Sequence, residues 1–115
     1  MAVITVFKRG GFDVINKERF YTFTGELRAV ADDVPDLGLV SDHISVILPE
    51  VSVQDISGEK IIMVVNGLVD LPSRTDKVLN DYAAKLGQVV RKFFPKIAVE
   101  VFISPLQTFH FIPRG

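Results

Sequence analysis

The chain has 115 residues, 48 % of them hydrophobic, and its 13 basic and 14 acidic residues leave a net charge of −1. This length fits one domain with a substantial core, and the balanced charge gives no electrostatic basis for binding nucleic acid or an anionic membrane. Because the chain contains no Cys, disulfides, thiolate zinc sites and a Cys nucleophile are excluded. No run approaches the ~20 apolar residues of a membrane span, so we expect a cytoplasmic protein.

The first half of the chain, about residues 1–57, is predicted to form a strand, a helix and a second strand. Residues 3–7 are rich in β-branched side chains, which favours a strand. Apolar residues then recur at steps of three and four from Phe20 to Val34, which predicts a helix that ends before Pro35. Alternating apolar residues from His43 to Leu48 predict the second strand.

The second half, about residues 58–115, repeats this plan. The unbroken apolar run 61–65 suits a strand buried on both faces, and Asn66-Gly67 predicts a turn or bulge behind it. In the last strand, residues 97–103, odd-numbered residues share one face and even-numbered residues the other. Glu100 lies on the second of these faces and is a candidate buried carboxylate.

The helix between these two strands has a start signal and a stop signal. Ser73 with Asp76 three residues later is the predicted N-terminal cap, and Pro95 ends the helix. Arg74 is either exposed, which we favour, or binds an anion at the helix N-terminus. The helix carries a broad apolar stripe, which indicates burial on more than one side: Val78, Leu79, Tyr82, Ala83, Leu86, Val89, Val90, Phe93 and Phe94.

The two halves are offset by roughly 55 residues, a period that internal repeats commonly show. They predict an α+β domain over residues 1–115, a tandem βαβ repeat that forms one four-stranded mixed sheet with both helices on one face. The other face, which includes part of the run 61–65, has nothing of its own chain to cover it. We therefore expect a second copy of the chain to cover it, in an oligomer.

The polar side chains contain no self-sufficient catalytic motif. His43 and His110 have no Asp or Glu at ligand spacing, so we expect no metal, and no glycine pair is followed by the residues of a phosphate loop, so we expect no cofactor. Lys8 and Arg9, beside two glycines, are candidate ligands for a carboxylate. The competing interpretation is a solvated turn.

The double repeat, the segment Ile44-Ser45-Val46-Ile47-Leu48-Pro49-Glu50 and the ending Val99-Glu100-Val101-Phe102-Ile103-Ser104-Pro105-Leu106-Gln107 resemble the tautomerase superfamily, the group of macrophage migration inhibitory factor and 4-oxalocrotonate tautomerase. The resemblance is strongest to small bacterial proteins of that fold. It implies a homotrimer with active sites at the subunit boundaries. It also implies keto–enol tautomerisation with an N-terminal proline as general base.

The sequence departs from this family at the decisive position, because Ala2 stands where the proline belongs. If Met1 is removed, the base is a primary amine with an ordinary pKa of about 7.7–8.0. The resemblance then implies Ala2 as the catalytic residue, with Lys8, Arg9 and His110 binding a small carbonyl acid. Ser45 occupies the position of a substrate-binding arginine of the family.

Three functions therefore compete. The first is a weak or degenerate keto–enol tautomerase, and the second is a non-catalytic trimer that binds a small carboxylate or a protein partner through the same boundaries. The third keeps the element order but assigns a ferredoxin-like ligand-binding domain. The order of the strands in the sheet separates the third function from the first two.

Overall fold

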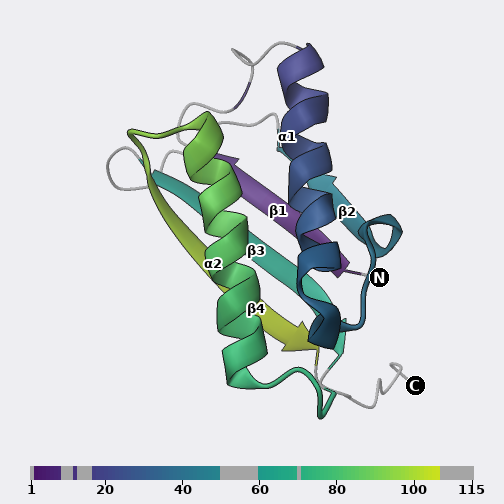
Figure 1. The fold of residues 1–115 in the computed structure, drawn as a ribbon. Helices are drawn as coiled ribbons and strands as arrows, with labels where there is room; N and C mark the ends of the chain where they lie inside the picture. Colours follow the sequence, from purple (N-terminus) through teal and green to yellow (C-terminus); the bar gives the residue numbers. More distant parts are fainter. Residues whose placement is uncertain (1, 9–11, 13–16, 50–59, 70, 107–115) are drawn as a thin grey trace, which may run out of the picture.

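The computed structural model describes residues 2–8, 12, 17–49, 60–69 and 71–106. The elements within these residues are β1 (Ala2–Lys8), α1 (Lys17–Ala29), the short 3₁₀ turns η1 (Val30–Asp33), η2 (Pro35–Leu37) and η3 (Ser41–His43), then β2 (Ile44–Ile47), β3 (Lys60–Val69), α2 (Asp76–Phe93) and β4 (Ala98–Leu106). The strands form one sheet, and both helices pack on the same face of it (Figure 1), which confirms the predicted α+β architecture. Neither helix in this part of the chain has the length and apolarity that crossing a membrane requires.

The strand order is β2-β1-β3-β4. β1 pairs in parallel with β2 and antiparallel with β3, and β3 pairs in parallel with β4. The two strands of each half are thus neighbours, whereas a ferredoxin-like sheet interleaves the strands of its halves. The ferredoxin-like alternative is therefore wrong.

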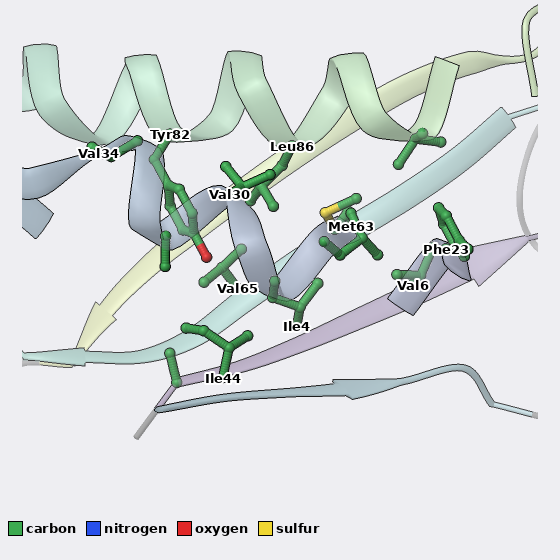
Figure 2. Packing of buried hydrophobic residues seen from close by; sticks show 14 of the residues in the cluster. Ile4, Val6, Phe23, Val30, Val34, Ile44, Met63, Val65, Tyr82 and Leu86 are labelled. Carbon is green, nitrogen blue, oxygen red and sulfur yellow. The ribbon is translucent and has the colours of Figure 1, made fainter. Parts of the chain in front are cut away.

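The core lies between the sheet and the two helices (Figure 2). On β3, Ile61, Met63 and Val65 have no exposed surface and face the helices, and the same alternation recurs on β1. The predicted stripe of α2 supplies Tyr82, Leu86 and Val90, which are fully buried, and α1 supplies Phe23 and Leu27. The stripe that the sequence predicted is therefore the one that packs.

Two turns require glycine. Gly67, with φ at 90°, lies in the bulge between Asn66 and Leu68 where the β3–β4 register shifts, so the predicted bulge is confirmed. Gly38 has φ at 72° and ends η2 in the left-handed conformation. Both positions tolerate this backbone because glycine has no Cβ.

The predicted start of the second helix is wrong. The helix begins at Asp76, and its N-cap is Thr75, whose hydroxyl oxygen accepts a hydrogen bond from the Val78 N–H at 3.3 Å. Ser73 lies two residues earlier, in the preceding turn, and is too far from the first helical turn to cap it. A second correction concerns α1, which ends at Ala29 and continues as 3₁₀ turns toward Pro35.

The sheet face opposite the helices is uncovered in the described chain, as predicted. We call it the open face; its residues alternate with those of the core and are Val3, Thr5 and Phe7 on β1, Ser45 and Ile47 on β2, Ile62, Val64 and Asn66 on β3, and Ala98, Glu100, Phe102 and Ser104 on β4. Two of its apolar side chains, Ile47 and Phe102, are 49 % and 54 % exposed. The register aligns them in one row across the sheet with Thr5 and Val64.

Glu100 is not a buried carboxylate in the described chain. Its side chain is 45 % exposed and forms an ion pair with Lys60 at 2.9 Å across β3 and β4. β4 is at the edge of the sheet, and its side chains on the uncovered face are in water unless a partner covers them. The alternation in the sequence assigns Glu100 to one face of the strand, but it does not show whether that face is covered.

Candidate functional site

The end of the sheet where β1 begins, which we call the Ala2 end, gathers several chain segments. β1 begins there, β3 and β4 end there, α1 ends there and α2 begins there (Figure 1). Ala2 has no exposed surface and pairs with Ile44, the first residue of β2. Its neighbour Val3 lies opposite Asn66 on β3. The first residue of a central strand is therefore enclosed by other elements.

Arg74 supplies a fixed cation at this end. Its Nε donates to the Leu37 carbonyl at 2.8 Å, and its Nη1 donates to the Val69 carbonyl at 2.6 Å. The guanidinium thus joins η2 to the end of β3, and no carboxylate pairs with it among the residues that the structure describes. The expectation that Arg74 is exposed is wrong, because these two carbonyls hold it half-buried. A guanidinium has five N–H donors, so further donors remain for an anion.

Negative charge dominates the rest of the Ala2 end. Six aspartates occupy the three 3₁₀ turns and the first turns of α2: Asp32, Asp33, Asp36, Asp42, Asp76 and Asp81. A cavity of about 460 Å³ lies between η2 and α2, and its charged lining is Asp33, Asp36, Asp81 and Lys77. An anionic ligand is therefore favoured next to Arg74 and disfavoured beside this cavity.

His43 is a titratable group at the same end. It directly precedes Ile44, the partner of Ala2, and its Nδ1 accepts a hydrogen bond from the Val40 N–H at 3.3 Å. This contact favours the neutral tautomer that carries its proton on Nε2. His43 was considered as a metal ligand from the sequence. Among the described residues, no group of three or more side chains that could hold a metal ion occurs.

The described structure does not bring the predicted site residues together. Lys8 ends β1 and Ala2 begins it, so the two lie ~20 Å apart at about 3.3 Å per residue. Arg9 and His110 lie outside the described residues. Ser45 lies on the open face beside Val3. The cation that does share the Ala2 end is Arg74, and its position just before a helix was the only sequence signal for it.

Tyr82 is a polar residue of α2 that lies in the core. Its side chain is fully buried, and its hydroxyl has no hydrogen-bond partner among the described residues. Burial raises the pKa of Tyr82 to about 12. Figure 2 shows the ring reaching from α2 toward the sheet, with its oxygen directed to the region of Val65 and Ile44. The phenol therefore stays protonated at every physiological pH.

Solved structures share this fold. A wild-type fused 4-OT described as an asymmetric trimer matches with a TM-score of 0.68 and 16% identity over 91% of this chain and 86% of that chain. A fused 4-OT described as a symmetric trimer gives 0.68 and 14% over 91% and 85%. A member of the cis-3-chloroacrylic acid dehalogenase family gives 0.63 and 15% over 90% and 75%. No family model matches the sequence, and no curated protein matches it.

These likenesses show the fold of the protein. The protein is an α+β domain with a βαβ arrangement in both halves and two helices on one face of a mixed sheet. It has the fold of the tautomerase superfamily, as the resemblance in the sequence predicted.

Proposed function

We propose that the protein is a homotrimer of the tautomerase fold and a weak or degenerate keto–enol tautomerase for a small carbonyl acid. Ala2, after removal of Met1, supplies the base, and Arg74 holds the carboxylate of the substrate. The proposal depends on one observation: the buried first residue of a central strand and a cation fixed by two main-chain carbonyls occupy the same end of the sheet.

The trimer is supported by the open face. Its central row contains Ile47, Val64 and Phe102, so a monomer leaves apolar surface in water. Fused 4-OT proteins of the same fold are described as trimers. Three copies that turn their open faces inward remove this surface from water without any new element.

The chemistry requires a neutral amine. A base that removes a proton from carbon and returns it to oxygen must be unprotonated near neutral pH. A primary amine lacks the ring that fixes the direction of a proline nitrogen. We therefore expect a low activity rather than an efficient one.

The remaining predicted ligands need a second subunit. Lys8 of one chain is ~20 Å from Ala2 of the same chain by strand geometry. We propose that Lys8, and with it Arg9 and His110, serve the site only where a neighbouring subunit brings them across the boundary.

The test is the enol–keto conversion of phenylpyruvate, followed in the wild type and in three variants. Ala2→Pro restores the rigid secondary amine and is expected to raise kcat. Arg74→Gln is expected to raise KM by about tenfold or more, because a charged hydrogen bond is worth roughly 1.5–3 kcal/mol. Arg91→Gln removes an exposed arginine of α2 and is the matched control, with no change expected. Blocking the N-terminal amine should abolish the wild-type activity.

One observation favours a second function, a non-catalytic trimeric binding protein. Ala2 lacks the proline ring, and six aspartates lie in the turns and the start of α2 at the same end of the sheet. Under this function neither the wild type nor Ala2→Pro converts phenylpyruvate, although calorimetry still detects carboxylate binding that Arg74→Gln removes. Activity that persists after the amine is blocked contradicts the first function outright.

A further inference from the structure

Two polar groups lie at the Ala2 end: the hydroxyl of Tyr82, and the amine that removal of Met1 creates at Ala2. The hydroxyl of Tyr82 is fully buried and unpartnered among the described residues. Ala2 is fully buried in the chain that carries Met1, and removal of Met1 creates a new amine at this residue. A buried hydroxyl without a hydrogen bond destabilises the fold, so the Tyr82 hydroxyl gains from a nearby acceptor.

The register places the two groups within two strand residues of each other. Tyr82 reaches from α2 toward Val65 (Figure 2), and Val65 pairs with Ile4. Ala2 is two residues from Ile4, so its side chain is on the same face of β1. Ile44, toward which the hydroxyl is also directed, is the register partner of Ala2.

We infer that Tyr82 is a positioning residue for the processed N-terminus: its hydroxyl donates a hydrogen bond to the Ala2 amine. The phenol donates to the nitrogen lone pair, which both satisfies the hydroxyl and directs the amine. This inference rests on the proposed function only for its catalytic meaning. The contact itself is a property of the processed chain.

The charged and titratable groups around this point come from three segments. Asp36 lies on η2, Asp42 and His43 lie on η3, and Arg74 precedes α2. They are outside the apolar core, whose only buried polar residue apart from Tyr82 among the described residues is Thr24 on α1. Tyr82 is therefore the donor that the core offers to the amine, while the surface charges act on it from a distance.

The experiment measures the pKa of the Ala2 amine in the intact protein, without substrate. Protein whose mass shows loss of Met1 is labelled with ¹⁵N-alanine and titrated by NMR, as wild type, Tyr82→Phe and Tyr21→Phe. Loss of a donor to the lone pair destabilises the neutral amine, so Tyr82→Phe is expected to raise its pKa by roughly half a unit to one unit. Tyr21 is 59 % exposed on α1, and its variant should leave the pKa unchanged.

Two controls keep the inference falsifiable. Protein that retains Met1 has its amine one residue away, and Tyr82→Phe should leave that amine unaffected. Circular dichroism shows whether each variant is folded. An equal amine pKa in wild type and folded Tyr82→Phe overturns the inference, and so does an equal shift in Tyr21→Phe. Because no turnover is measured, an inactive enzyme with the expected shift refutes the tautomerase and leaves the contact standing.

Discussion

Replacing Tyr82 with Phe is expected to reduce the loss of unfolding free energy that the protein undergoes at alkaline pH. Burial raises the pKa of Tyr82 from 10.0 to about 12, because the phenolate cannot be solvated in the core. In the unfolded chain the phenol ionises at its ordinary pKa. The folded value lies above the unfolded one, so the contribution of the neutral phenol is fully present below the unfolded pKa and disappears as the pH rises through the folded pKa.

The magnitude follows from the difference between the two pKa values. A shift of about two units corresponds to about 3 kcal/mol, which is lost in full only above about pH 12. About half of it is lost by roughly pH 11, where the unfolded phenol is mostly ionised and the folded phenol is not. Wild type should therefore lose about 1.4 kcal/mol relative to Tyr82→Phe between roughly pH 8 and pH 11.

Urea unfolding followed by circular dichroism measures this difference across that pH range. Tyr21→Phe removes an exposed tyrosine and serves as the matched control. All other alkaline titrations, of lysines above all, are common to the three proteins and cancel in the comparison. A constant difference between wild type and Tyr82→Phe would refute the reasoning, because the hydroxyl would then titrate as if it were in water.

Five further substitutions test the proposed oligomer and the fold. Phe102→Glu puts a charge on the open face, and light scattering should show a smaller particle than for the wild type, which we propose to be a trimer. Leu86→Ala empties a fully buried site and should lower the unfolding free energy by about 2–5 kcal/mol in urea. Gly67→Ala should cost roughly 1–2 kcal/mol, because its φ is 90°. Thr75→Ala should lower the thermal stability by about 1 kcal/mol, whereas Ser73→Ala should have almost no effect.

Much of the fold could be predicted because the deciding information is local. The alternation in residues 97–103 placed Val99 and Val101 on one face and Phe102 on the other, and the structure adds that the first of these faces packs on the core. The Asn66-Gly67 pair predicted a turn or bulge, and a bulge occurs there in β3. Strand periodicity and glycine conformation each depend on a few neighbouring residues, so both can be predicted from a short stretch of sequence.

The candidate site was harder to predict because its contacts join distant residues. Arg74 is held by the carbonyl of Leu37, which is 37 residues away in the chain. Every residue has a main-chain carbonyl, so the sequence does not show which carbonyl binds a side chain. The sequence therefore did not distinguish this arginine from an exposed one. The cap was missed for a related reason, since Ser73 and Thr75 both suit an N-cap and the packing of α2 decides which one begins the helix.

The oligomer and the site are linked by the geometry of β1. A strand separates Lys8 from Ala2 by ~20 Å, so a site that uses both requires two chains, whereas a site that uses Ala2 and Arg74 requires one. Phe102→Glu separates these cases when mass and carboxylate binding are measured on the same sample. Binding that disappears together with the trimer assigns Lys8 or another residue of the neighbouring subunit to the site. Binding that survives in the dissociated chain assigns the site to residues of one chain, as proposed for Arg74, whose guanidinium is fixed at the Ala2 end.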